Sequence, residues 1–118
     1  MVNITLRVLS RPSVAKLPHT LAMVRAGGEA ITQQMLHQIA PHVTLTNDYG
    51  PTEVSVVSVM KVVARAEVRL NAIGKPLPNV TCHVINPSIE VPFMKLQPIG
   101  VWGELWLGGI QVARGYLR

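Results

Sequence analysis

Apolar and polar positions in the first half of the chain follow the periods of strands and of one helix. Residues 3–9 alternate and are rich in β-branched side chains, and residues 20–26 predict a second strand that ends at a glycine pair. Apolar side chains then recur at helical spacing on one face: Ile31, Met35, Leu36 and Ile39. Thr32 is a suitable N-cap, and Pro41 follows the end of this helix. With a short strand at residues 43–46, the order predicts a β-α-β unit with a parallel sheet.

The pattern changes after residue 53, where no helical periodicity of comparable strength follows. Four runs resemble strands, with Gly and Pro between them: 54–63, 80–86, 101–108 and 110–113. This half is therefore predicted to be mostly β, as antiparallel hairpins or part of a barrel. We expect an α/β chain with one part at 1–53 and a β-rich part at 54–118, so that a polar stretch lies where the two meet.

The composition is apolar for a free-standing domain. Hydrophobic residues make up 48% of the 118 residues and charged residues 14%, whereas a typical domain has about 25% charged residues. Too few charges are present to cover the surface of a small fold. We therefore expect part of the surface to lie against something else, as in a piece of a larger body.

The charge and cysteine content exclude some classes of function. A net charge of +5 permits anionic partners, but the basic residues are scattered and aromatics are only 4%, so nucleic acid is not expected. A basic subregion that serves a phosphorylated small molecule fits the charge as well, and a chance excess of basic residues fits it best. Cys82 is the single cysteine, which favours a reducing compartment. Without a signal sequence or a long apolar span, the sequence predicts a cytoplasmic protein with no membrane partner.

The stretch N-D-Y-G-P-T-E carries more chemistry than a turn requires. Tyr49 beside Gly50 offers a flat face next to open backbone, and the Asn47 amide can both donate and accept. Thr52 offers a hydroxyl to a phosphate oxygen, and Glu53 offers a hard oxygen ligand to Mg²⁺. The same residues would also make a polar turn with a solvated carboxylate. On residue chemistry alone, the two interpretations have equal support.

Other motifs say less. Gly27 and Gly28 stand between a strand and a helix, which suits either a ligand at the helix start or a plain turn. Neither G-x-x-x-x-G-K-[ST] nor G-x-G-x-x-G occurs in the chain. The four histidines lack metal-ligand spacing, and no serine has G-x-S-x-G surroundings.

Three stretches together resemble adenylate-forming enzymes: AGGEAIT at 26–32, NDYGPTE at 47–53 and GELWLGGIQVARGYL at 103–117. More narrowly, they are similar to the adenylation domains of nonribosomal peptide synthetases. I-G-K-P-L at 73–77 also matches that family. The resemblance implies the end of a flavodoxin-like subdomain, followed by a mostly antiparallel, β-barrel-like subdomain. It also implies that ATP and an amino acid yield an aminoacyl adenylate and pyrophosphate before a carrier thiol is loaded.

The resemblance assigns roles to particular residues. Asn47 would contact the adenine edge, Tyr49 would stack on the ring, and Thr52 would bind the α-phosphate. Glu53 would hold Mg²⁺, so that Thr52 and Glu53 are the expected catalytic residues. The expected cofactor-binding residues are Gly27, Gly28, Asn47, Tyr49, Gly50 and Thr52. The expected substrate pocket consists of Leu9, Val24, Ala26, Asp48, Val56 and Val57.

Asp48 is the unusual member of this pocket. A buried carboxylate costs several kcal/mol unless it is paired, so a cationic or hydroxylated substrate side chain would suit Asp48. The alternative is that Asp48 turns to solvent.

The implied partners are an amino acid, the rest of the adenylation domain, and carrier and condensation domains in the same polypeptide, with phosphopantetheine on the carrier. The family's phosphate loop, ribose-binding Asp and catalytic Lys fall outside residues 1–118, so we expect these residues alone to be inactive. Two alternatives stay open. One is a truncated, non-catalytic protein that binds a nucleotide or a partner, and the other is a segment of an acyl- or aryl-acid ligase.

Overall fold

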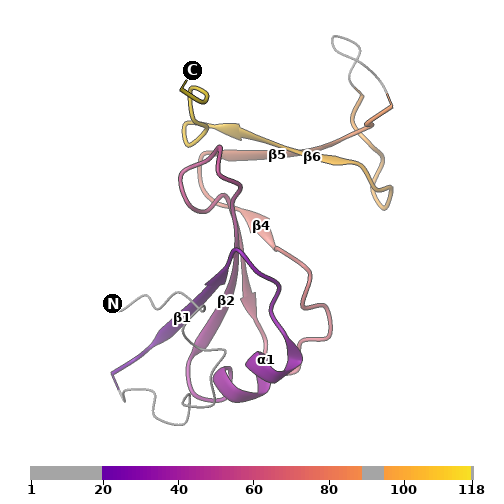
Figure 1. The fold of residues 1–118 in the computed structure, drawn as a ribbon. Helices are drawn as coiled ribbons and strands as arrows, with labels where there is room; N and C mark the ends of the chain where they lie inside the picture. The colour runs from indigo at the N-terminus through magenta and orange to yellow at the C-terminus, as the bar shows by residue number, and fades with distance from the viewer. Residues whose placement is uncertain (1–19, 89–94, 118) are drawn as a thin grey trace.

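The computed structural model of the protein describes residues 20–88 and 95–117. Within these residues the chain forms one helix, a four-stranded sheet and a separate two-stranded sheet (Figure 1). The strand predicted at residues 3–9, together with the candidate pocket residue Leu9, lies outside the described residues. No helix in the described part of the chain is long and apolar enough to cross a membrane.

The predicted β-α-β unit is confirmed. Strands β1 (Met23–Gly27) and β2 (Thr44–Tyr49) are parallel neighbours, and helix α1 (Gln33–Ile39) connects them. The helix begins as expected, because Thr32 Oγ1 accepts a hydrogen bond from Met35 N at 3.2 Å. This bond satisfies one of the amides that the first helical turn leaves free.

Strand β2 is longer than the sequence predicts. The prediction ends this strand at residue 46, whereas β2 continues through Asn47 and Asp48 to Tyr49. The first three residues of the N-D-Y-G-P-T-E stretch therefore lie on a central strand, and only the remainder forms a loop. Because side chains alternate along a strand, Asn47 and Tyr49 share one face of the sheet and Asp48 lies on the other.

The four-stranded sheet has the order β1-β2-β3-β4. Strand β3 (Val59–Val63) is antiparallel to β2, and β4 (Lys75–Pro76) is antiparallel to β3. The strand predicted at 54–63 starts too early, because Val56 has a positive φ of 57° that no regular strand accommodates. The first sheet thus continues past Glu53, and the division into domains at that residue stays a prediction.

The second sheet consists of β5 (Val80–Ile85) and β6 (Glu104–Gly109), which pair antiparallel over their whole length. The predicted strand at 101–108 is therefore present but begins later. The run at 110–113 contributes one bridge, from Val112 to Val54, instead of a strand. The antiparallel pairing is confirmed, and in the described residues these two strands do not close into a barrel.

The hydrophobic core lies between α1 and the first sheet (Figure 1). Leu36 and Ile39 of the helix are 2% and 0% exposed, and burial of each contributes about 1.5–3 kcal/mol. The buried cluster consists of Leu21, Val24, Ala26, Ile31, Leu36, Ile39, Ala40, Leu45 and Val63. This core holds β2 in place and so positions the polar stretch at the end of that strand.

Candidate functional site

The loop that follows β2 folds back tightly. The amide of Ser58 donates to the carbonyl of Tyr49 at 2.8 Å, which closes the loop at the point where β3 begins. A Cβ on Gly50 would come within 2.3 Å of the Val56 carbonyl oxygen, so only glycine fits there. The sequence assigned Gly50 to cofactor binding, whereas the structure supplies a packing reason for this glycine.

The loop is also joined to the C-terminal segment. Ala113 N donates to Glu53 O at 2.7 Å, and Ser55 N donates to Gln111 O at 2.9 Å. Between these bonds lies the bridge formed by Val54. Two of the stretches that carry the family resemblance, distant in sequence, are thereby brought side by side.

The Glu53 carboxylate meets a tyrosine that the sequence analysis did not single out. Tyr116 Oη donates to Glu53 Oε1 at 2.7 Å, and both side chains are exposed. This bond, helped by a backbone hydrogen bond of Glu53, lowers the pKa of the Glu53 carboxyl below its ordinary value. The same bond raises the pKa of Tyr116. Glu53 is therefore ionised near neutral pH, as a cation ligand must be.

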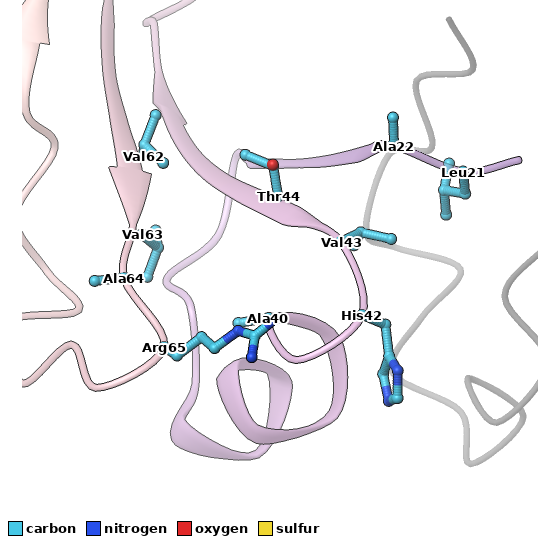
Figure 2. Close-up of a pocket in the computed structure, with 10 residues that line it drawn as sticks. All are labelled: Leu21, Ala22, Ala40, His42, Val43, Thr44, Val62, Val63, Ala64 and Arg65. Atoms are coloured by element: carbon cyan, nitrogen blue, oxygen red, sulfur yellow. The ribbon is translucent and has the colours of Figure 1, made fainter. Parts of the chain in front are cut away.

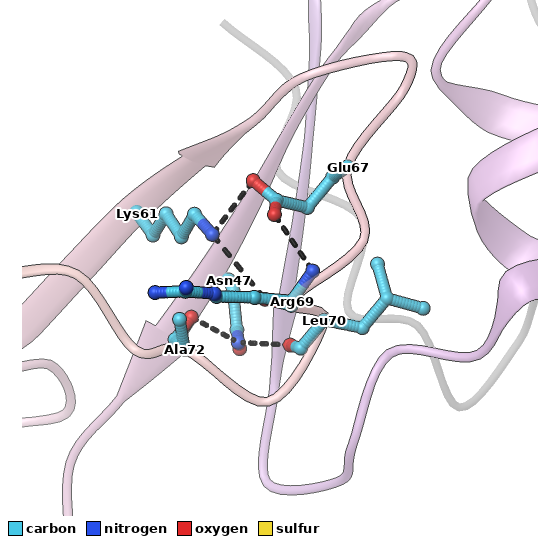
Figure 3. A network of polar contacts seen from close by, with 6 residues as sticks. All are labelled: Asn47, Lys61, Glu67, Arg69, Leu70 and Ala72. Carbon is cyan, nitrogen blue, oxygen red and sulfur yellow. Dashed lines mark hydrogen bonds and ion pairs between the residues drawn. The ribbon is translucent and has the colours of Figure 1, made fainter.

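Asn47 is buried and binds a neighbouring loop (Figure 3). Its Nδ2 donates to the carbonyl oxygens of Leu70 and Ala72 at 3.2 and 3.1 Å. Both amide hydrogens are used in this way, so only Oδ1 is left to contact a ligand. In the expected contact with an adenine edge, Asn47 can therefore act only as a hydrogen-bond acceptor, through Oδ1.

The same loop carries a small polar network beside Asn47 (Figure 3). Lys61 Nζ lies 2.7 Å from Glu67 Oε2 and donates to Arg69 O at 3.3 Å. Arg69 N in turn donates to Glu67 Oε1 at 2.8 Å. These contacts, with those of Asn47, hold the segment between β3 and β4 against β2.

Asp48 forms an ion pair with Arg25 through Arg25 Nε and Asp48 Oδ2. The Asp48 side chain is only 5% exposed, so the alternative that it turns to solvent is wrong. The parallel register explains the pair: Gly27 lies opposite Asp48 and Arg25 lies opposite Thr46, which puts both charged side chains on one face of the sheet. Asp48 Oδ1 is buried and has no hydrogen-bond partner among the described residues.

The other predicted pocket residues do not meet in one place in the described structure. Val24 and Ala26 are 0% and 1% exposed in the core beside α1, on the face opposite Asp48. Val56 is 85% exposed, and Val57 is half-buried in the loop. The pocket assignment therefore has no support from proximity among these residues.

The glycine pair stands at the end of β1, beside β2. A Cβ on Gly27 would lie 3.0 Å from Asp48 O, so this glycine permits close packing of the two strands. Gly28 has a positive φ of 81° and open space around it. Thr52 is exposed and the Tyr49 ring is 36% exposed, so both could reach a ligand.

An open pocket of ≈ 440 Å³ lies elsewhere, next to the end of α1 and the start of β2 (Figure 2). It is lined by Leu21, Ala22, Ala40, His42, Val43, Thr44, Val62, Val63, Ala64 and Arg65. Among the described residues, none that is predicted to bind nucleotide or substrate lines it.

The described residues fit a magnesium ion that takes most of its ligands from phosphate oxygens and water. Within the described residues, no group of three or more His, Cys, Asp or Glu side chains could hold a metal, and Glu53 forms no ion pair there. Mg²⁺ is usually bound by one or two carboxylates together with phosphate oxygens and water. A single exposed, ionised Glu53 meets that requirement.

Proteins similar to this chain include nonribosomal peptide synthetases. A family model described as AMP-binding enzyme matches residues 1–117. The chain is 39% identical over 99 residues to tyrocidine synthase 3 of Brevibacillus parabrevis, a match to 81% of this chain and 1% of that protein. It is 35% identical over 112 residues to nonribosomal peptide synthetase 7 of Aspergillus fumigatus, covering 91% of this chain and 4% of that protein.

Solved structures agree with the sequence matches. The N-terminal subdomain of Klebsiella oxytoca NpsA, in complex with 3-hydroxybenzoyl-AMSN, has a TM-score of 0.76 at 24% identity, covering 97% of this chain and 28% of that one. Holo-AB3403, a four-domain nonribosomal peptide synthetase bound to AMP and glycine, has a TM-score of 0.73 at 28% identity, covering 97% of this chain and 8% of that one.

The protein therefore belongs to the AMP-binding enzyme family, and its residues correspond to a segment of a nonribosomal peptide synthetase adenylation domain. The chain spans only a few per cent of the length of the two curated relatives, 1% and 4%.

Proposed function

We propose that this chain forms part of the nucleotide and metal site of an amino-acid-activating adenylation domain. The reaction of that domain joins ATP and an amino acid into an aminoacyl adenylate, releases pyrophosphate, and then loads a carrier thiol. The observation that carries the proposal is the join between the Thr52-Glu53 loop and the segment at 111–116, which leaves an ionised carboxylate exposed at its centre.

Each residue contributes through the groups that the structure leaves accessible. Glu53 would hold Mg²⁺, which when bound supplies positive charge to phosphate oxygens. The exposed Thr52 hydroxyl donates to a phosphate oxygen, and the partly exposed Tyr49 ring offers a face to adenine. Asn47 accepts from the base through Oδ1, since both of its amide hydrogens bind the loop at 70–72.

The substrate pocket is proposed with one change from the sequence interpretation. Asp48 is already paired with Arg25, so a cationic substrate side chain is not needed to neutralise it. We propose that the ion pair leaves Asp48 Oδ1 to accept a hydrogen bond from an uncharged donor on the substrate side chain. Val24, Ala26, Val56 and Val57 stay in the proposal on the strength of the resemblance.

The finer architecture and the partners also belong to this proposal. The four-stranded sheet would be the end of a flavodoxin-like subdomain, and β5–β6 would be part of a barrel-like one. Carrier and condensation domains in the same polypeptide are part of the proposal, and multidomain relatives support it: holo-AB3403 is a four-domain nonribosomal peptide synthetase, and PA1221 contains adenylation and PCP domains. Residues 1–118 alone are expected to be inactive, and the cytoplasmic location stays a prediction.

The test is ATP–pyrophosphate exchange by the natural full-length polypeptide that carries these residues. Panels of amino acids, aryl acids and fatty acids are compared, because the NpsA structure holds a hydroxybenzoyl compound. We expect exchange with an amino acid, and a loss of at least about 100-fold in Glu53→Gln. Glu104→Gln, an exposed glutamate on β6, is the matched control and should keep full exchange. Exchange driven only by aryl or fatty acids, or unaffected by Glu53→Gln, would contradict the proposal.

A further inference from the structure

We propose that Tyr116 is a positioning residue whose hydroxyl holds the Glu53 carboxylate in the orientation in which Glu53 takes Mg²⁺. The two residues are separated by 63 positions in the chain, yet Tyr116 Oη and Glu53 Oε1 lie 2.7 Å apart. This inference rests on the proposed function, because it takes Glu53 as the metal ligand.

Backbone hydrogen bonds hold the two segments side by side at this contact. Glu53 O accepts from Ala113 N at 2.7 Å, and Gln111 O accepts from Ser55 N at 2.9 Å. Two hydrogen bonds around one bridge set the register of the two segments. Tyr116 follows three residues after the paired Ala113, so the pairing of the two segments brings Tyr116 close to Glu53.

The contact gives the two oxygens of the Glu53 carboxylate different roles. Tyr116 donates to Oε1, and no hydrogen bond to Oε2 is present within the described residues, so Oε2 can bind a cation. An exposed glutamate otherwise samples many rotamers, and ordering it costs up to about 2 kcal/mol of side-chain entropy. A tyrosine has only two side-chain torsions, so its hydroxyl can fix the carboxylate at small entropic cost. Carboxylates that ligate metals are commonly hydrogen-bonded in this way, and losing the outer partner costs roughly 10–100-fold in metal affinity or activity.

Tyr116 is 73% exposed, so a metal measurement is needed to separate a positioning role from a surface contact. Mn²⁺ is titrated into the natural full-length polypeptide saturated with AMP, and free Mn²⁺ is counted by electron paramagnetic resonance. Tyr116→Phe removes only the hydroxyl and should weaken Mn²⁺ binding roughly 10-fold. AMP affinity without metal, and the melting temperature, should match the wild type. Trp102→Phe, which changes another exposed aromatic side chain, is the control and should bind Mn²⁺ normally.

A second variant shows whether Tyr116 acts through Glu53. In a Glu53→Gln background, removing the hydroxyl should weaken Mn²⁺ binding by less than about twofold, because the residue it positions is already changed. Equal losses in both backgrounds would overturn the positioning role. Normal Mn²⁺ affinity in Tyr116→Phe, with weakened affinity in Glu53→Gln, would overturn the inference and leave the proposed function standing. Normal affinity in Glu53→Gln would overturn the proposed metal role and the inference with it.

Discussion

The two sheets of this protein differ in how far their hydrophobic side chains are buried. Among the described residues, every buried hydrophobic side chain except Ile85 belongs to the α1-covered sheet and its connections. In the β5–β6 sheet the backbone pairing is complete, yet Val84 and Trp106 remain 40% and 39% exposed. Two-stranded sheets without such burial are marginally stable in water. Backbone pairing therefore shapes the second region, whereas in the described part of the chain a hydrophobic core cluster lies only in the first.

The less buried region nevertheless supports the candidate site. The segment after β6 pairs with the Glu53 loop and brings Tyr116 to the carboxylate. The core under α1 positions β2, and the segment at 111–116 positions the loop that leaves β2. The site therefore depends on both regions.

The largest expected effect concerns the core. Leu36→Ala removes a side chain that is 2% exposed under the first sheet, and should lower the free energy of unfolding by about 3–5 kcal/mol. Leu96→Ala makes the same change beside β5 at a side chain that is 64% exposed, and should cost less than about 0.5 kcal/mol. Urea denaturation measures both. Equal losses of stability would contradict the difference in burial between the two regions.

The next largest effect concerns the ion pair between Arg25 and Asp48, which lies on the face of the first sheet opposite the core. Arg25→Met leaves the Asp48 carboxylate buried without its partner, and should cost about 2–3 kcal/mol, since Arg25 is itself 33% exposed. The double variant Arg25→Met/Asp48→Leu should recover most of that loss. If the single variant is as stable as the wild type, the pair does not stabilise the sheet.

A smaller effect is expected at Asn47. Asn47→Ala removes two hydrogen bonds to the loop at 70–72, and should cost about 1–2 kcal/mol. Amide hydrogen exchange should quicken in residues 64–73 and stay unchanged in β5. Asn47→Asp is the sharper variant, because a carboxylate cannot donate to either carbonyl. Unchanged exchange in the loop would mean that other contacts hold it.

The smallest effect is the pH dependence from Glu67. A hydrogen bond from Lys61 and one from the Arg69 amide lower the pKa of Glu67 below its ordinary value. A lowered pKa gives stability that is present above the unfolded-state pKa and is lost as pH falls through the folded-state pKa. The urea midpoints of the wild type and of Glu67→Gln should therefore differ at pH 6 and converge toward pH 3. Lys61→Met should flatten the same dependence, and a difference that persists at pH 3 would contradict this cause.

Local patterns predicted the first region well. The helical spacing, Thr32 and Pro41 located α1, and the order of elements gave the parallel pair β1 and β2. Strand β4 was missed because two residues, one of them proline, carry no strand pattern. The valines at 54–58 favour a strand, whereas short-range hydrogen bonds within this run form a loop.

The contacts of the site were harder to predict because they join residues far apart in the chain. Arg25 was missed, although a charged residue at that position in an apolar strand is a signal that a partner lies on the neighbouring strand. Tyr116 is one of two tyrosines in the chain and lies in the third stretch that resembles the family, and these were the available signals. Neither partner follows from sequence spacing, since the register between segments comes only from the fold.

The most direct test of a site that depends on both regions is hydrogen–deuterium exchange of the natural full-length polypeptide with and without AMP and Mg²⁺. Ligand should slow amide exchange at residues 50–55 and at 111–116 together, because hydrogen bonds join the two segments. Slowing confined to the first region, with 111–116 unaffected, would contradict the account.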